Sequence, residues 1–495
     1  MIDNFIAGSV ALFGDPFTIG IFVFGVIGGM LFGAIPGVSM LTLAAILLPF
    51  TANLEPAQGV MLFAVIYCTG TYGGAITAIL FNIPGAPENA PTAFDGYPMT
   101  RKGQSGKAVG AAVLCSAIGG VTSAIVMMAA TEPLANWAIS NIGPPEIFAL
   151  VFFGLAVASS VGGRTLWKGW MSVLLGLLIA TIGQDPVGGI NRYNFGFSDL
   201  AAGIAFVPAI LGFFAVSEIF VQAEKKAIGM YEAPKLSLDF PTILELWTHK
   251  IAVVRSILVG FFCGILPGIG ATLAAFMGYG EAVRWSKNKE SFGKGNLEGV
   301  ISSETANNAA TGAAMIPLLA LGLPGGALTA MMVAVFQMHD LEPGPLVFYN
   351  SPELIWIVFA AMFYANVSIL FIGLIETKTI LHLLKIPFQF LAPMILLLAS
   401  IGSYIGRGLV LDVMIMFCTG IMGFLLRRSG YSIPGIVLGI ILGKIGEQNF
   451  AQGMQMVHYD LLEYLSRPIC LLLIVAGSLT LLAGIYKALS YSFKS

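Results

Sequence analysis

Long runs of apolar residues, separated by short polar or glycine- and proline-rich stretches, dominate the chain. Eleven such runs occur, at 17–34, 57–83, 108–130, 147–161, 169–182, 201–221, 256–277, 354–375, 390–401, 410–426 and 469–488. A helix needs about 20 apolar residues to cross the hydrocarbon layer, so the runs predict about ten to twelve spanning or half-spanning helices. The runs do not alternate in polarity, as the strands of a membrane β-barrel do. The pattern therefore predicts an all-α polytopic membrane protein.

Composition agrees with this prediction. Hydrophobic residues make up 57% of the 495 residues and charged residues only 10%, whereas a soluble domain carries roughly 25% charged residues. The mean hydropathy is +0.88. The first ten residues, "MIDNFIAGSV", contain no basic segment, so we expect no cleavable signal peptide. The five cysteines show no paired spacing, and we expect buried free thiols rather than disulfides or metal ligands.

Two apolar stretches are broken by Pro-Gly in the same way. "GAIPGVSMLTLAA" (33–45) contains Pro36-Gly37, and "GILPGIGATLAAF" (264–276) contains Pro267-Gly268, 231 residues further on. A second anchor follows each: "GTYGGAITAILFNIPG" ends at Pro84-Gly85, and "NNAATGAAMIPLLALGLPG" ends at Pro324-Gly325. The common order predicts an internal repeat. The alternative is that Pro and Gly are simply more frequent in membrane helices than in soluble ones.

The charges around the two breaks suggest opposite orientations. No Lys or Arg occurs in residues 1–100, whereas basic residues flank the second break on both sides, at 225, 226, 235, 250, 255, 284, 287, 289 and 294. Lys and Arg collect in cytoplasmic loops, so the first element has both ends outside and the second has both ends inside. We expect re-entrant hairpins in an inverted repeat, with halves 1–222 and 253–495 joined by a cytoplasmic linker, 223–252. Inverted repeats with broken helices are typical of secondary transporters.

The breaks also supply candidate binding groups. The N-terminus of a half-helix offers free N–H groups and a partial positive charge, which suit a carboxylate. Unwound carbonyls and hydroxyls suit a sodium ion. Polar or small residues next to the breaks are Ser39, Thr42, Asn82, Gly270 and Thr272.

The most polar run within apolar sequence is "SSETANNAATG" (302–312), which contains Asn307, Asn308 and Thr311. Amides in hydrocarbon are costly and should face protein or a water-filled cavity. Substrate or ion binding is one interpretation, and hydrogen bonding between helices is the other. Glu304 in the same run is equally consistent with a cap at a helix entrance.

Two further polar segments are predicted to be loops. The segment "PENAPTAFDGYP" (87–98) reads as a turn-rich loop, in which Asp95 is more typical of a turn former than of a ligand. The segment "GQDPVGGINRYNFG" (183–196), with Asp185 and Arg192, reads as a surface loop.

Several functions lack their motifs. The sequence contains no phosphate-binding G-x-x-x-x-G-K-[ST] and no H-E-x-x-H. The four histidines are scattered, no Ser or Cys sits in a nucleophile elbow, and no basic stripe with interleaved aromatics indicates nucleic acid. We therefore expect neither an enzyme nor a nucleic-acid-binding protein, and no cofactor. A channel is the alternative of a different class.

At these motifs the chain resembles the large membrane subunit of the tripartite tricarboxylate transporters. The resembling segments, in chain order, are "GAIPG", "YGGAITAILFNIPG", "PTAFDGYPMTRKGQSGKA", "GQDPVGGINRYNFG", "GILPGIGAT", "ETANNAA" and "LGLPGGALTAMM". They extend from about residue 25 to 330. One departure is Val38-Ser39, where a further glycine is common in the family.

The resemblance implies a multi-pass subunit of the bacterial inner membrane. Its partners would be a small four-helix membrane subunit and a periplasmic solute-binding protein that delivers an organic carboxylate. A more distant similarity to tripartite ATP-independent periplasmic transporters implies an elevator-type mechanism. Transport would be secondary, with sodium favoured as the coupling ion and a proton as the alternative. A stand-alone exchanger without a binding protein is the nearest rival.

The family's motif residues that carry over to this chain are Pro36, Gly37, Pro84, Gly85, Pro267, Gly268, Asn307, Asn308, Pro324 and Gly325.

Overall fold

A computed structural model describes residues 1–35, 38–161, 166–185, 188–224, 241, 243–266, 270–383 and 388–492. Two Pro-Gly breaks, Pro36-Gly37 and Pro267-Gly268, and most of the expected linker lie outside the described residues.

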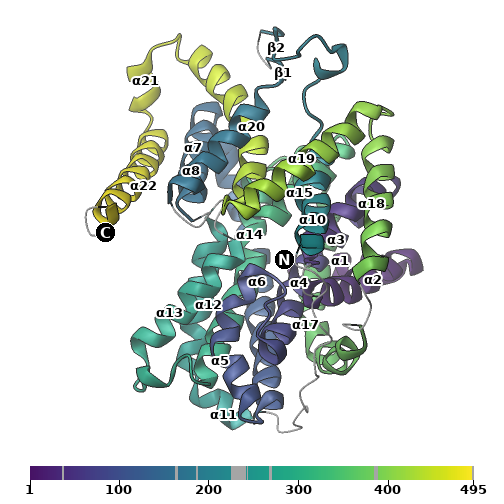
Figure 1. The fold of residues 1–495 in the computed structure, drawn as a ribbon. Coiled ribbons are helices and arrows are strands. Elements are labelled where there is room, and N and C mark those ends of the chain that lie inside the picture. Colours follow the sequence, from purple (N-terminus) through teal and green to yellow (C-terminus); the bar gives the residue numbers. More distant parts are fainter. Residues whose placement is uncertain are drawn as a thin grey trace.

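The described chain is almost entirely helical (Figure 1). The helices up to residue 224 are α1 (Ile2–Gly14), α2 (Pro16–Ala34), α3 (Met40–Leu47), η1 (Leu48–Asn53), α4 (Pro56–Phe81), η2 (Pro87–Asn89), α5 (Ala90–Arg101), α6 (Ser105–Asn141), α7 (Pro144–Val161), α8 (Leu166–Ala180), η3 (Ser198–Leu200), α9 (Phe206–Ile210), the π-helical turn η4 (Leu211–Val216) and α10 (Ser217–Glu224).

The helices after residue 242 are α11 (Ile243–Thr248), α12 (Lys250–Ile265), α13 (Gly270–Trp285), η5 (Lys289–Ser291), α14 (Leu297–Leu321), α15 (Ala327–Met338), α16 (Val347–Asn350), α17 (Pro352–Leu383), α18 (Phe388–Ile405), α19 (Val410–Arg428), α20 (Ile433–Met456), α21 (Leu461–Ser466) and α22 (Pro468–Ser492).

Seven of the described helical stretches are long and apolar enough to span a bilayer, namely α2, α4, α6, α9 through α10, α17, α19 and α22. Six further apolar helices are shorter, at 10–17 residues. The expected membrane protein is thus confirmed. The apolar runs 147–161, 169–182 and 390–401 lie in shorter helices, and the run 256–277 is divided between α12 and α13.

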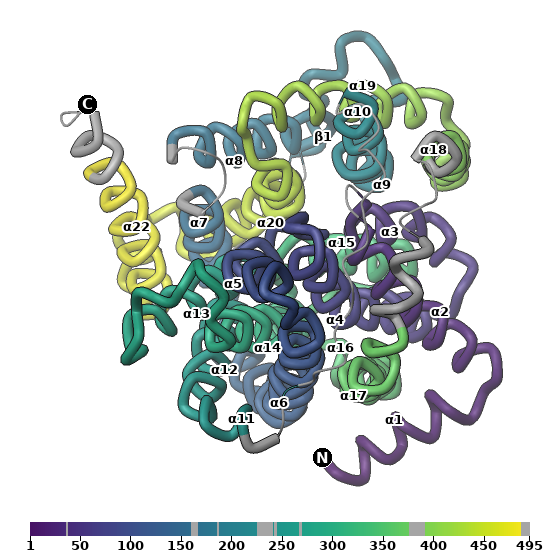
Figure 2. Tube along the Cα trace, turned by 60° about the horizontal axis from the view of Figure 1, so that its bottom comes forward, coloured from purple at the N-terminus to yellow at the C-terminus, as the bar shows by residue number. Residues whose placement is uncertain are grey.

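Two helices, α4 and α14, form the centre of the fold. Nearly every residue of both is buried, and Figure 2 shows them surrounded by other helices, with α1 and α22 at opposite edges of the molecule. Helix α4 packs mainly against α2 and α17, and α14 packs mainly against α12 and α6. The polar run 302–312 of α14 would be costly in contact with lipid, and enclosure by other helices gives these side chains partners within the protein.

Glycines allow the neighbours of these helices to approach closely. A Cβ on Gly33 of α2 would lie 2.4 Å from the Gly70 carbonyl oxygen of α4. A Cβ on Gly264 of α12 would lie 2.6 Å from the Ala310 carbonyl oxygen of α14. Small residues at such contacts allow backbone-to-backbone packing, on which membrane helices depend.

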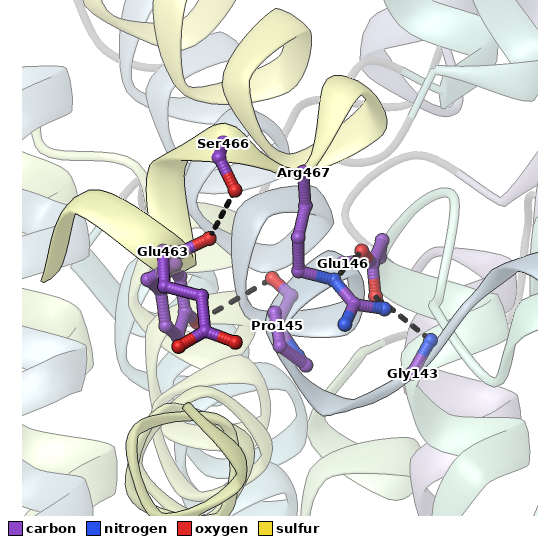
Figure 3. A network of polar contacts seen from close by, with 7 residues as sticks. Gly143, Pro145, Glu146, Glu463, Ser466 and Arg467 are labelled. Carbon is purple, nitrogen blue, oxygen red and sulfur yellow. Dashed lines mark hydrogen bonds and ion pairs between the residues drawn. The ribbon is translucent and has the colours of Figure 1, made fainter. Parts of the chain in front are cut away.

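Arginine–carboxylate pairs join the outer helices. Figure 3 shows Arg467, just before α22, beside Glu146 in the first turn of α7; Nε lies 2.5 Å and Nη2 3.1 Å from the carboxylate oxygens. The Gly143 N–H donates to the same carboxylate at 2.9 Å. These bonds attach the C-terminal helix α22 to α7, against which it packs.

Two loops differ from, or refine, the sequence-based expectation. The segment 87–98 is not a turn-rich loop but forms η2 and most of α5. The segment 183–196 contains two short antiparallel strands, β1 (Gly183–Gln184) and β2 (Asn191–Arg192). Arg192 pairs with Glu447 of α20, which anchors this hairpin to the helical body.

Asp95 is likewise not a turn former. It lies within α5 and is fully buried. One of its oxygens accepts the N–H groups of Gly295 and Asn296 at 2.8 Å, and the other accepts the Tyr279 hydroxyl at 2.8 Å. Asp95 therefore ties α5 to α13 and to the start of α14.

Candidate functional site

The N-termini of α13 and α15 meet in the interior. Gly270, the first residue of α13, has a positive φ of 60°. A Cβ placed on it would lie 3.9 Å from the Gly325 carbonyl oxygen and 3.9 Å from Gly326 Cα, at the start of α15. Each helix N-terminus carries a partial positive charge, and two adjacent N-termini suit an anionic group.

Beside this junction lies η2, which follows Pro84-Gly85. The hydroxyl of Thr272, in the first turn of α13, donates to Glu88 Oε2 over 3.4 Å. Asn307 of α14 directs its Nδ2 to the Glu88 carbonyl oxygen, also over 3.4 Å. Glu88 and Asn307 are buried. Three predicted elements, the second tip, the loop after α4 and the polar run of α14, are thus brought together.

Glu304 lies deeper in α14 and is not at a helix entrance, so that interpretation is wrong. Its side chain is fully buried. Oε1 accepts the Thr92 hydroxyl of α5 at 2.5 Å, and Oε2 accepts the Ser116 hydroxyl of α6 at 2.9 Å. Asn307 Nδ2 adds a longer contact of 3.4 Å. The Glu304 carboxyl group thus links α14 to α5 and α6 by accepting hydroxyl hydrogen bonds. These contacts are consistent with a structural role and also with a role in binding an ion.

Thr311 faces the middle of α4, while Asn308 bonds to residues of its own helix. The Thr311 hydroxyl donates to the Asn308 carbonyl oxygen at 2.8 Å and lies 3.8 Å from the Cys68 sulfur. Asn308 Nδ2 donates to the Glu304 carbonyl oxygen and to Asn307 Oδ1. Interhelical contact and local hydrogen bonding thus account for part of this polar run.

The first tip also contacts α4. Ser39 precedes α3, and its carbonyl oxygen accepts the Thr42 N–H at 2.9 Å. Met40 packs against Gly70 of α4. Thr42 is buried, while Ser39 is partly exposed. Within the described residues, no hydrogen bond links Ser39 or Thr42 to Thr272.

The backbone conformation of Asn82 explains its presence at the end of α4. It ends α4 in the left-handed conformation, with φ 59°, and its side chain is exposed. The loop beyond it returns toward α4, where the Gly85 N–H donates to the Gly74 carbonyl oxygen at 3.3 Å. A Cβ on Gly85 would lie 1.9 Å from the Gly33 carbonyl oxygen, so only glycine fits there.

Pro324-Gly325 occupies the corresponding place after α14. Gly325 lies against Ala314, where a Cβ would be 3.1 Å from the Ala314 carbonyl oxygen. Gly322 ends α14 with φ 74°.

Sequence reasoning did not identify several polar residues of this region. They are Glu88, Asn89, Thr92, Ser116 and Asn366, all of them buried. The segment that contains Glu88, Asn89 and Thr92 reads as a loop because of its prolines, and Ser116 and Asn366 stand alone in apolar helices. Ser116 and Asn366 could have been found by looking for single polar residues inside apolar runs.

A separate cavity of about 360 Å³ lies where η1, α9, α15, α18 and α19 meet. Arg407 lines it and forms a two-pronged ion pair with Asp412, whose side chain is 1% exposed. The buried hydroxyl oxygen of Ser403 lies on the same wall and has no hydrogen-bond partner. The polar groups of this cavity are distinct from those near Thr272.

Within the described residues, no group of three or more His, Cys, Asp and Glu side chains could hold a metal ion. All five cysteines are free, as expected, but Cys418 is exposed rather than buried. The interior offers hydroxyls, amides, helix ends and the carboxyl groups of Glu88 and Glu304. The hydroxyls, amides and helix ends can bind an anion or a cation by hydrogen bonding and ion–dipole attraction.

Comparison with known proteins identifies relatives across the whole chain. Residues 19–438 match the tripartite tricarboxylate transporter TctA family. An uncharacterized 52.8 kDa protein in the TAR-I ttuC′ 3′ region of Agrobacterium vitis is 35% identical over 478 residues, covering 95% of this chain and 93% of the relative. An uncharacterized protein in the TAR-II ttuC′ 3′ region of the same organism is 35% identical over 218 residues, covering 44% of this chain and 90% of the relative. No solved structure matches the chain.

The seven candidate spans and the enclosed polar centre fit a transport protein rather than an enzyme. With the family model matching most of its length, the chain belongs to the tripartite tricarboxylate transporter TctA family, as a multi-pass transporter subunit of the inner membrane.

Proposed function

We propose that the chain is the large transmembrane subunit of a cation-coupled, binding-protein-dependent secondary transporter that imports tricarboxylates or related organic acids. The observation that carries this proposal is the meeting of the α13 and α15 N-termini next to Thr272 and Asn307. These groups supply partial positive charge and hydrogen-bond donors without a lysine or arginine, which suits a carboxylate that has to be released again.

The coupling ion has a physical role at this site. Glu88 lies within hydrogen-bonding reach of Thr272 and is buried. A substrate carboxylate placed beside it meets a like charge in a low-dielectric interior, where repulsion is strong. A bound sodium ion removes this repulsion, and so does a proton on Glu88. We propose sodium, because it also suits the carbonyl and hydroxyl oxygens around the tips.

We further propose that the two halves form an inverted repeat and move as an elevator. Equivalent contacts in the two halves support the repeat. Gly33 lies on Gly70, and Gly264 lies on Ala310. Gly264 comes 231 residues after Gly33, and Ala310 comes 240 residues after Gly70. The shift of 240 residues also relates the end of α4 at Asn82 to the end of α14 at Gly322.

Helix directions agree with this arrangement. On α6, Gly119 packs against Thr305, and the Ser123 hydroxyl donates to the Ala309 carbonyl oxygen. The contact moves toward higher residue numbers on both helices, so α6 and α14 run parallel. Their N-termini therefore lie on the same side of the membrane. The basic residues near the start of each, Arg101, Lys102 and Lys294, favour the cytoplasmic side for that end.

The family name implies that the subunit works within a three-part system. We propose a small four-helix membrane subunit and a periplasmic solute-binding protein as partners. The binding protein delivers the carboxylate to the outer surface, and the chain carries it across the bilayer.

Uptake of labelled citrate into liposomes tests the proposal. The liposomes contain this chain and the small subunit, the binding protein is added outside, and an inward sodium or proton gradient is imposed. Uptake that requires both sodium and the binding protein supports the proposal. Uptake without the binding protein indicates a stand-alone exchanger, and non-saturable flux without counterflow indicates a channel. Dicarboxylates are tested in parallel, because citrate is only one member of the class.

A further inference from the structure

Three buried asparagines, Asn89, Asn308 and Asn366, have a side-chain oxygen that no donor reaches. The Asn89 oxygen lies against Gly74 of α4, 2.1 Å from the position of a Cβ. Asn308 of α14 and Asn366 of α17 are 0% and 1% exposed. The Oδ1 atom of each is buried and has no hydrogen-bond partner. A buried acceptor without a partner costs about 1–3 kcal/mol, so two such atoms point to a ligand that satisfies them.

The orientation of both amides is fixed by their other end. Asn308 Nδ2 lies 3.2 Å from the Glu304 carbonyl oxygen and 2.8 Å from Asn307 Oδ1. Asn366 Nδ2 lies 2.8 Å from the Met362 carbonyl oxygen. These partners are acceptors, so exchanging O and N in either amide would bring two oxygens together. The unpaired atoms are therefore oxygens and not misassigned nitrogens.

Both oxygens belong to the place where α4, α6, α14 and α17 meet. The Asn366 amide contacts the Cys68 thiol of α4, and its Oδ1 lies against Gly120 of α6, 1.8 Å from the position of a Cβ. Cys68 in turn contacts Thr311, one helical turn beyond Asn308. Gly120 leaves room for the Asn366 oxygen, and any larger residue would fill that space.

We propose that Asn308 and Asn366 form part of a binding site for a monovalent alkali cation, with sodium as the ion. The inference rests on the proposed function, since a bound cation in the core of this fold serves as a coupling ion. It places a second sodium ion at the crossing of α4 and α14, in addition to the ion proposed beside Glu88 and Thr272. Hard cations prefer oxygen ligands, and calcium sites recruit several carboxylates. The orphan atoms here are neutral amide oxygens, and this favours a single positive charge.

Thermal unfolding of the purified chain in detergent tests the site. The probe is NaCl, compared with KCl and choline chloride at equal ionic strength. A ligand that binds only the folded state raises the unfolding midpoint with a saturating concentration dependence. We expect sodium to raise it and choline not to. Equal midpoints in the three salts overturn the proposal and indicate water or no ligand at the two oxygens.

Variants locate the effect. Asn366→Leu removes the orphan oxygen and is expected to raise the half-saturating sodium concentration at least tenfold, and Asn308→Leu to do the same. Asn449→Leu is the matched control, because its Nδ2 also bonds the carbonyl oxygen four residues earlier, and its Oδ1 is not among the unpaired atoms. An unchanged sodium response in both core variants overturns the proposal.

These experiments can contradict the sodium site and the transport proposal independently of each other. If Asn366→Leu does not fold, Asn366→Asp, which keeps the shape and adds a charge, should lower the half-saturating sodium concentration, and an unchanged value contradicts the site. Carboxylate uptake without any sodium effect on unfolding leaves the transport proposal standing and removes this site. If sodium raises the unfolding midpoint in a way that depends on Asn366, but no carboxylate is taken up, the sodium site stands and the transport proposal fails.

Discussion

Asn82 and Gly322 end the two central helices with the same backbone turn. Both have left-handed φ values, 59° and 74°. The residue after each donates its N–H back to the carbonyl oxygen six positions earlier, from Ile83 to Thr77 at 3.3 Å and from Leu323 to Pro317 at 3.1 Å. This is the Schellman form of a helix end, in which Gly is preferred and Asn is the usual substitute. Each turn directs the chain back toward the middle of its own helix.

This relationship predicts that Asn82 acts through its backbone. Asn82→Gly should keep transport and stability close to those of the unchanged protein, because Gly adopts the left-handed region freely. Asn82→Val should lower stability by about 1–2 kcal/mol, the cost of a branched side chain in that region. Thermal unfolding and uptake measured together decide the matter. Loss of uptake in a stable Asn82→Gly variant would show instead that the amide binds substrate.

Close helix packing at Gly33 and Gly264 gives a second prediction. Alanine at either position pushes a methyl group into a backbone carbonyl of the neighbouring helix. Overpacking of this kind typically costs about 1–3 kcal/mol. We expect Gly33→Ala and Gly264→Ala to lower the unfolding midpoint by similar amounts.

Gly280→Ala is the control for these variants. It is also helical, and nothing lies within 4 Å of its Cβ position. Alanine is the better helix former by about 1 kcal/mol, so this change should leave the midpoint unchanged or raise it. Equal effects at all three positions would contradict the packing argument.

The sequence predicted the membrane class and the helical fold. Two residues that it proposed for the site, Thr272 and Asn307, both contact Glu88 in the structure. The sequence could predict these features because apolar runs and Pro-Gly breaks are local signals. It misassigned Asp95 and Glu304, since their contacts with Tyr279 and Ser116 come from other parts of the chain. Prolines made 87–98 resemble a loop, although Pro91 lies in the first turn of α5, where its missing N–H costs nothing. Asn366 was overlooked because a single amide in an apolar helix has no pattern.

Glu304 supplies a third prediction. Glu304→Ala leaves the buried hydroxyl of Ser116 without its acceptor, which costs about 1–3 kcal/mol, whereas Thr92 keeps the Ser303 hydroxyl as a partner. Glu304→Gln keeps an acceptor oxygen and the side-chain volume, so it should be less destabilising. Glu298→Ala, in the first turn of the same helix and bonded to Ser286, is the control with a small expected effect. Unfolding midpoints compare the three.

Glu304→Gln also distinguishes sodium coupling from proton coupling. Under sodium coupling, sodium-driven uptake persists in this variant, because Gln cannot carry a proton but preserves the contacts between helices. Abolished uptake in a folded Glu304→Gln variant would argue for proton coupling through this residue.

The Arg407–Asp412 pair predicts a strong dependence on the arginine. Asp412 is buried, so Arg407→Ala leaves an uncompensated charge, which costs about 3–5 kcal/mol. The double variant Arg407→Ala with Asp412→Ala should recover part of this loss. Arg284→Ala removes an exposed pair with Glu281 and should change stability by less than about 1 kcal/mol. Similar losses for Arg284 and Arg407 would show that the burial of Asp412 does not matter.

The central claim is that the α13 N-terminus and its neighbours hold the substrate carboxylate. Its most direct test is sodium-driven uptake of labelled carboxylate by Thr272→Val in liposomes that contain the small subunit, with binding protein outside. This change removes one hydroxyl and keeps the side-chain shape, and Thr248→Val, outside the candidate site, is the control. The account predicts at least a tenfold loss of uptake for Thr272→Val alone, with an unchanged unfolding midpoint. Uptake equal to that of the control would contradict the claim.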